Sequence, residues 1–211
     1  MIAGTNSGCG KTTVTCAVLQ ALVNRKINVS SFKCGPDYID PMFHKTVIGT
    51  AAYNLDTYLM SNDAVTFSAN KNTGNIAVIE GVMGFYDGFS FTEKGSTHEL
   101  SEITDTDDIL VVYCRGMSMS AMALVKGFKE HRKNNIKGVI FNNLSGKLYG
   151  DLSEECRKIG LVPLGFLPNI KDVQISSRHL GLVTAGEIDG IKDKMNLLAD
   201  YAEKYIDIDK I

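Results

Sequence analysis

The sequence predicts an α/β fold with three layers, in which helices cover both faces of a mainly parallel central sheet. Three observations favour this fold. Short β-rich runs alternate along the chain with segments of helical periodicity, a pattern typical of parallel sheets joined by crossover helices. A glycine-rich turn joins the first run to the first helical segment. Carboxylates directly follow apolar runs, at the sheet edge where α/β proteins bind ligands.

The expected elements follow from these local patterns. Residues 1–4 form a short opening strand, and residues 11–24 form a helix because Val14, Val18 and Leu22 recur on one face. Further strands, each a short β-rich run, are expected at 29–34, 75–80, 108–114, 136–142 and 161–167. Further helices are expected at 64–71, 99–104, 118–132, 148–159 and 188–205.

Residues 4–13, with the sequence GTNSGCGKTT, indicate a phosphate-binding loop. Its glycines let successive backbone N–H groups point at one anion, and the following helix presents its positive end. Lys11 would contact the β- and γ-phosphates, and the Thr12 hydroxyl would contact Mg²⁺. The residues expected to hold the nucleotide here are Asn6, Ser7, Gly8, Cys9, Gly10, Lys11, Thr12 and Thr13.

The loop departs slightly from the usual spacing. Thr5 stands where the first glycine is expected, and Gly4 takes its role one position earlier. A glycine-rich turn that only caps a helix is the simpler alternative. Together with the β–α alternation, the loop makes the expected fold one of the P-loop NTPase type, and ATP the expected nucleotide.

An acidic loop follows the second expected strand. Residues 33–41, KCGPDYIDP, place Asp37 and Asp40 in a stiff turn between two prolines. Beside a bound triphosphate, such carboxylates are neutralised well by Mg²⁺. Lys33 could balance phosphate charge from the opposite side. The alternative is an ordinary turn with solvated aspartates.

A further carboxylate, Glu80, ends the apolar run at residues 75–80. This position brings it to the carboxyl edge of the sheet, where a metal ligand is needed opposite Thr12. The alternative for Glu80 is a strand-end residue paired with a lysine. Asp87 follows in a glycine-rich loop, where a role at the γ-phosphate and a plain loop role are both open.

Composition narrows the classes of function. The net charge of −2 argues against a broad nucleic-acid surface, and the sequence has no apolar run long enough for a membrane span. The five cysteines form an odd set without C-x-x-C spacing, which is typical of reduced, buried thiols rather than disulfides or a zinc site. We therefore expect a cytoplasmic protein.

Four motifs in this order carry a specific resemblance: IAGTNSGCGKTT, FKCGPDYIDP, VIEGVMGFYDG and RHLGLV. They resemble the ATP-binding synthetase domain of the cobyrinic acid a,c-diamide synthase family, which amidates two acetate side chains of a corrin precursor in cobalamin biosynthesis. The resemblance extends from Ile2 to about Val183. The phosphate loop alone would also fit dethiobiotin synthetase and many partition ATPases.

The resemblance implies a mechanism and a set of site residues. ATP would phosphorylate a substrate carboxylate, and ammonia would then displace phosphate to leave an amide. The implied metal ligands are Thr12, Asp37 and Glu80, and the implied catalytic residues are Lys11, Asp37, Tyr38, Asp40, Glu80 and Asp87. Asn142 is similar to an asparagine that contacts the purine in related enzymes, although a turn residue is an equal alternative.

Family members normally continue into a glutaminase domain that supplies the ammonia. We expect residues 1–190 to form the synthetase domain and residues 191–211 a terminal helix leading to a linker, with the glutaminase part in another piece or subunit. The expected partners are a tetrapyrrole substrate and this ammonia source, with a homodimer also open.

Two rival functions remain open. A partition-type ATPase, which switches by dimerising on ATP, usually carries an early lysine where this chain has Asn6. The nickel-sirohydrochlorin a,c-diamide synthase uses the same motifs as the cobalamin enzyme, because both substrates are acetate-bearing tetrapyrroles. The sequence therefore does not choose between these two amidations.

Overall fold

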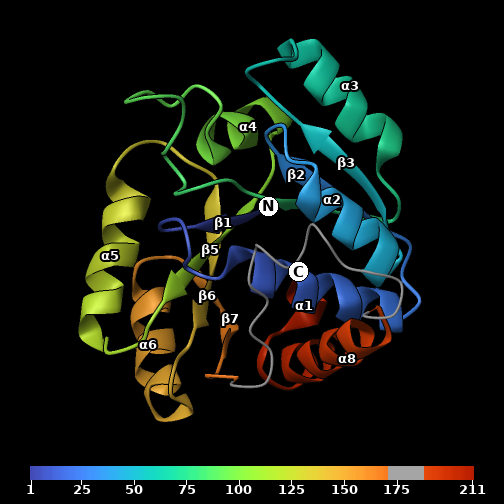
Figure 1. Ribbon diagram of the computed structural model, residues 1–211. Helices are drawn as coiled ribbons and strands as arrows, with labels where there is room; N and C mark the ends of the chain where they lie inside the picture. Colours follow the sequence, from blue (N-terminus) through green and yellow to red (C-terminus); the bar gives the residue numbers. More distant parts are fainter. Residues whose placement is uncertain (171–187) are drawn as a thin grey trace.

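A parallel sheet forms the middle layer of the protein, as the computed structural model in Figure 1 shows. The structure describes residues 1–170 and 188–211, and within them the sheet has seven strands in the order β3-β2-β4-β1-β5-β6-β7. Every neighbouring pair of strands is parallel. The strands are β1 (Ile2–Gly4), β2 (Val29–Cys34), β3 (Ala51–Leu55), β4 (Ile76–Glu80), β5 (Asp108–Tyr113), β6 (Ile136–Asn142) and β7 (Val162–Leu167). The predicted three-layer α/β fold is confirmed.

Helices cover both faces of this sheet. They are α1 (Lys11–Asn24), α2 (Ile39–Phe43), the π-helical turn η1 (His44–Ile48), α3 (Asn62–Asn72), α4 (Thr97–Thr104), α5 (Met119–Glu130), α6 (Gly146–Lys158), α8 (Ile188–Tyr205) and the short η3 (Ile208–Lys210). One face packs against α1, η1 and α8, and the other against α3, α4, α5 and α6. The strands divide their apolar side chains by alternation: Val111 joins the first core, whereas Leu110 and Val112 join the second.

All the predicted elements are present, with ends that differ by at most two residues. The strand β3 and the turns at residues 39–48 were not predicted. β3 lies at the edge of the sheet, pairs only with β2 among the described strands and has several exposed side chains. An edge strand of this kind lacks the continuous apolar run that marks a buried strand.

The terminal helix α8 lies alongside α1 (Figure 1). Its buried residues Met195, Leu198 and Ala202 join the same core as Val14 and Val18 of α1. Arg25, just after α1, pairs with Glu203 and with Asp209. The helix behind the phosphate loop is therefore held by the last described segment of the chain.

Among the described helices, none combines the length and the apolar character that crossing a membrane requires.

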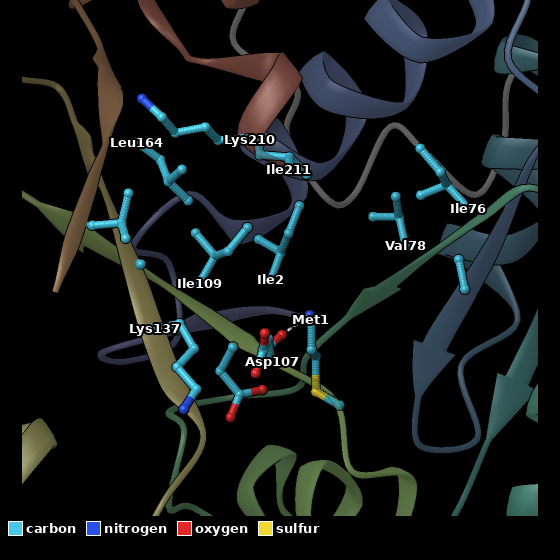
Figure 2. A pocket seen from close by; sticks show the side chains of 14 residues that line it. Met1, Ile2, Ile76, Val78, Asp107, Ile109, Lys137, Leu164, Lys210 and Ile211 are labelled. Carbon is cyan, nitrogen blue, oxygen red and sulfur yellow. Dashed lines mark hydrogen bonds between the residues drawn. The ribbon is translucent and has the colours of Figure 1, made fainter.

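A cavity of about 330 Å³ lies at the amino-terminal edge of the sheet (Figure 2). It lies beside the first residues of β4, which have no described β1 partner because Ile2 pairs with Glu80 at the other end of that strand. Apolar side chains such as Ile109 and Leu164 line it, with Asp107 and Lys137 also present. The phosphate loop follows the opposite end of β1, so this cavity is separate from the candidate site.

Candidate active site

The phosphate loop connects the carboxyl end of β1 to the start of α1. Gly10 has a φ of +99°, a left-handed conformation that glycine adopts without strain. A Cβ at this position would lie 2.0 Å from Nδ2 of Asn142, so the loop and β6 approach each other too closely for a side chain. The Asn142 amide donates a 2.9 Å hydrogen bond to the Cys9 carbonyl. In this structure Asn142 thus holds the loop in place, while the purine contact stays a prediction.

Lys11 folds back across the loop. Its ammonium donates hydrogen bonds to the carbonyls of Asn6 and Met83. The side chain is buried, and this burial lowers the pKa of Lys11 below its ordinary value. A phosphate placed at the loop would supply the negative charge that this buried ammonium lacks.

Thr12, Lys33, Asp40 and Glu80 form one cluster at the carboxyl edge of the sheet. The Thr12 hydroxyl donates a 2.6 Å hydrogen bond to Glu80 Oε1. The Lys33 ammonium lies 2.9 Å from the same oxygen and 2.7 Å from Asp40 Oδ2. Lys33 and Glu80 meet because they are registered neighbours on β2 and β4. Glu80 thus pairs with a lysine, as the alternative expects, and it also lies against Thr12; its role as a metal ligand stays a prediction.

Lys33 is charged although it is buried. Burial lowers its pKa, but the neighbouring carboxylates of Glu80 and Asp40 outweigh this effect and raise the pKa above its ordinary value. The described partners of Lys33 are these two carboxylates, and its contact with phosphate stays a prediction. The buried cluster thus holds one ammonium against two carboxylates.

The second oxygen of Glu80 tests whether the cluster fits a divalent cation. Glu80 is fully buried, and its Oε2 has no hydrogen-bond partner among the described residues. The other oxygen, Oε1, lies against the Thr12 hydroxyl, and a buried carboxylate beside a threonine hydroxyl offers the oxygen ligands that Mg²⁺ prefers. No group of three His, Cys, Asp or Glu side chains suited to a metal occurs in residues 1–170 and 188–211. Mg²⁺ typically completes its shell with water and phosphate, so Thr12 and Glu80 fit this ion.

The remaining predicted site residues have other contacts. Asp37 accepts hydrogen bonds from the backbone N–H groups of Ile39 and Asp40, so it caps the start of α2. Tyr38 is 78% exposed. Asp87 accepts a 3.0 Å hydrogen bond from the Gly84 N–H.

The loop that carries Asp87 lies directly against the phosphate loop. The Phe85 N–H donates to the Gly4 carbonyl, and a Cβ on Gly84 would lie 3.1 Å from the Thr5 carbonyl oxygen. The structure thus brings Asp87 to the phosphate loop and Asp40 to Glu80. It places Asp37 and Tyr38 on the exposed turn beside them.

All five cysteines are buried and free in the structure, as predicted. Burial raises the pKa of Cys34 and of Cys114 to about 12, and that of Cys156 to about 11. Burial also raises the pKa of Cys16. These four thiols are therefore protonated at neutral pH and poor nucleophiles.

Sequence reasoning missed two residues of the site, His44 and Ser31. His44 lies beneath the cluster, with Nδ1 2.7 Å from the Ser31 hydroxyl and Nε2 3.7 Å from Glu80 Oε2. The sequence feature that could have pointed to these residues is Ser31, a polar residue within the buried strand β2. The RHLGLV motif at residues 178–183 lies outside the described residues.

Comparisons with known proteins agree with this geometry. Residues 1–183 match the family described as the CobQ/CobB/MinD/ParA nucleotide binding domain. The cobyrinate a,c-diamide synthase of Thermoplasma volcanium is 42% identical over 98% of this chain and 46% of its own length. That of Sulfolobus acidocaldarius is 39% identical over 100% of this chain and 48% of its own. The chain thus spans about half the length of the curated relatives it matches.

Solved structures share the fold at low sequence identity. The MinD cell division protein of Aquifex aeolicus has a TM-score of 0.58 at 15% identity, covering 94% of this chain and 95% of its own. A nucleotide-binding protein of Archaeoglobus fulgidus, solved in complex with ADP, has a TM-score of 0.54 at 12% identity, covering 85% and 84%. The family match and the whole-length similarity to the synthases confirm the resemblance drawn from the motifs. The chain belongs to the CobQ/CobB/MinD/ParA nucleotide binding domain family, and over its whole length it is similar to about half the length of the cobyrinate a,c-diamide synthases.

Proposed function

We propose that this chain is the ATP-binding synthetase part of a cobyrinate a,c-diamide synthase. It would amidate the a- and c-acetate side chains of cobyrinic acid, with ATP as the phosphoryl donor. The observation that carries the proposal is the buried Glu80 carboxylate, hydrogen-bonded to Thr12 at the head of α1 and beside the phosphate loop. The names of the relatives supply the substrate class.

In the first proposed step, an oxygen of a substrate acetate attacks the γ-phosphorus of ATP, and ADP leaves. The N–H groups of the loop and Lys11 would hold the phosphates in line. Thr12 and Glu80 would hold Mg²⁺, with Asp37 as the third predicted ligand. When bound, this ion would neutralise charge on the phosphates.

In the second proposed step, ammonia attacks the acyl carbon of the resulting acyl phosphate. Phosphate leaves, and one proton is lost from nitrogen to give the amide. Asp40, Tyr38 and Asp87 are the residues proposed to orient the substrate carboxylate or the ammonia. Asp40 and Asp87 are supported by their places beside Glu80 and the phosphate loop.

The ammonia source is proposed to lie outside this chain. The relatives are about twice as long, which leaves room for a glutaminase part. In this proposal residues 1–190 are the synthetase domain, and residues 191–211 lead on from it. We also propose a cytoplasmic location, where ATP and glutamine are available.

The test is incubation with ATP, Mg²⁺, an ammonium salt and cobyrinic acid, with products weighed by mass spectrometry. The proposal predicts mono- and diamide products, with one ADP released for each amide formed. Glu80→Gln should abolish product formation and leave the fold intact. A parallel reaction with nickel-sirohydrochlorin identifies the tetrapyrrole, and amidation of that substrate alone would overturn the choice of cobyrinic acid. ADP release that needs neither tetrapyrrole would indicate a switch ATPase instead.

A further inference from the structure

His44 occupies an unusual place directly beneath the candidate active site. It begins the π-helical turn η1, a distortion that occurs often at functional sites. Its side chain is fully buried between β2, β4 and α1. Nδ1 lies 2.7 Å from the Ser31 hydroxyl, and Nε2 lies 3.7 Å from Glu80 Oε2 and 3.8 Å from the Cys16 sulfur.

The two ring nitrogens of His44 face different groups. Nε2 faces a carboxylate oxygen, which only accepts hydrogen bonds, and Nδ1 faces the Ser31 hydroxyl, which can donate one. With the N–H on Nε2, the ring donates toward Glu80 while Nδ1 accepts from Ser31.

The two oxygens of Glu80 have different hydrogen-bonding neighbours. Oε1 accepts hydrogen bonds from Thr12 and Lys33. Oε2 is buried without a hydrogen bond among the described residues, and its polar neighbour is Nε2 of His44. The 3.7 Å separation is about 0.8 Å longer than a usual N–H···O hydrogen bond, so a small movement of the carboxylate closes it.

We propose that His44 is a positioning residue that orients the Glu80 carboxylate toward a cation, and that Ser31 in turn fixes the His44 ring. The inference rests on the proposed function, because the orientation of the Glu80 carboxylate matters only if Glu80 binds Mg²⁺. A donor behind one carboxylate oxygen leaves the other turned toward Thr12. Residues behind metal ligands commonly act in this way, and their loss weakens metal binding or activity 10- to 100-fold.

The test measures Mg²⁺ binding by calorimetry in the presence of a non-hydrolysable ATP analogue. His44→Leu should weaken Mg²⁺ binding about 10-fold, while binding of the analogue without Mg²⁺ stays unchanged. His44→Gln should retain most of the Mg²⁺ affinity, because its amide N–H can donate to Glu80. Ser31→Ala should weaken Mg²⁺ binding in the same direction, and this variant carries the test if His44→Leu does not fold.

A matched control separates positioning from stability. Val125→Ala removes two methyl groups from a buried residue of the other core, so it should lower the unfolding temperature without changing Mg²⁺ affinity. Unchanged Mg²⁺ affinity in both His44→Leu and Ser31→Ala would overturn the inference. In that case, loss of Mg²⁺ binding in Glu80→Gln would show that the proposed cation site still stands. If Glu80→Gln also binds Mg²⁺ normally, the cation site of the proposed function fails as well.

Discussion

Lys33 supplies the positive charge that the buried cluster contains in this structure. Its ammonium contacts two carboxylates, those of Asp40 and Glu80, and all three side chains are buried. Breaking a buried ion pair by removing one partner is costly, because the remaining charge stays out of water. The residue is thus needed for folding as well as for any contact with phosphate.

Lys33→Met is therefore expected to lower the free energy of unfolding by about 3 kcal/mol. Millimolar Mg²⁺ should restore part of this loss, because the proposed cation binds one of these carboxylates, that of Glu80, in the folded state only. Urea titrations with and without Mg²⁺ measure both effects. Lys126→Met, at an exposed position of α5, is the control and should change stability little. Equal stability of Lys33→Met and wild type would contradict this account of the cluster.

Gly10 limits what the phosphate loop tolerates. Gly10→Ala should abolish nucleotide binding, because the new Cβ would collide with Asn142 and the φ of +99° would be strained. Binding of a fluorescent ATP analogue checks this. Gly150→Ala is the matched control, since Gly150 is exposed within helix α6 and a Cβ there would meet no neighbouring atom; it should raise stability by about 0.5–1 kcal/mol. Normal binding by Gly10→Ala would argue against the loop geometry.

The strand β5 begins with a buried carboxyl group. Asp108 Oδ2 accepts a 2.7 Å hydrogen bond from Ser101, whereas Oδ1 has no hydrogen-bond partner in the described part of the chain. Burial raises the pKa of Asp108 from 3.8 to about 6, against the attraction of the Met1 ammonium. The folded chain therefore binds this proton more tightly than the unfolded chain does.

This pKa gives a pH dependence with a definite sign. The stability contributed by protonated Asp108 is complete below pH 3.8 and is lost as the pH rises to about 6. Asp108→Asn should remove that part of the decline. The measurement is the free energy of unfolding of both proteins between pH 4 and pH 7. If the difference between them does not change with pH, Asp108 does not titrate as described.

The elements show which parts of the fold local sequence can predict. Buried strands such as β4 and β6 are short apolar runs, and α1 has an apolar face, so their types follow from the sequence. The edge strand β3 has mostly exposed or half-buried side chains, and its pairing with β2 depends on residues far away in the chain. Nothing in its local pattern separates it from a loop.

The candidate site divides in the same way. Thr12 and Glu80 were predictable because a loop motif and the end of an apolar strand fix their places. The pairing of Lys33 with Glu80 depends on β2 and β4 being neighbours, which local sequence does not state. Helix α2 starts at Ile39, so Asp37 accepts hydrogen bonds at its first turn, whereas Asp40 lies within the helix and contacts the buried Lys33. His44 needed the three-dimensional structure, because its partners come from three separate elements.

At the scale of the whole molecule, the core that holds α1 also includes α8, near the end of the described chain. The two helices lie side by side, so the phosphate loop rests on a helix supported along its length (Figure 1). The carboxyl edge of the sheet carries the candidate site, and the opposite edge carries the apolar cavity of Figure 2. The proposed chemistry thus occupies one edge of the sheet.

The chain is expected to use ammonium and not glutamine as its nitrogen source. The thiols of Cys16, Cys34, Cys114 and Cys156 are buried and protonated, and Cys9 lies in the phosphate loop, so none suits attack on glutamine. The measurement is glutamate release from glutamine by the purified chain, beside amide formation with an ammonium salt. Glutamate release by this chain alone would contradict the proposed division between synthetase and glutaminase parts.

We propose above all that the loop of residues 4–13 holds the triphosphate of ATP, and that Thr12 and Glu80 hold the Mg²⁺ bound to it. The most direct measurement is a crystal structure with Mg²⁺ and a non-hydrolysable ATP analogue. The account predicts the phosphates within the loop of residues 4–13, with the cation in contact with the Thr12 hydroxyl and the Glu80 carboxylate. A triphosphate bound elsewhere, or a cation that does not contact Glu80, would contradict it.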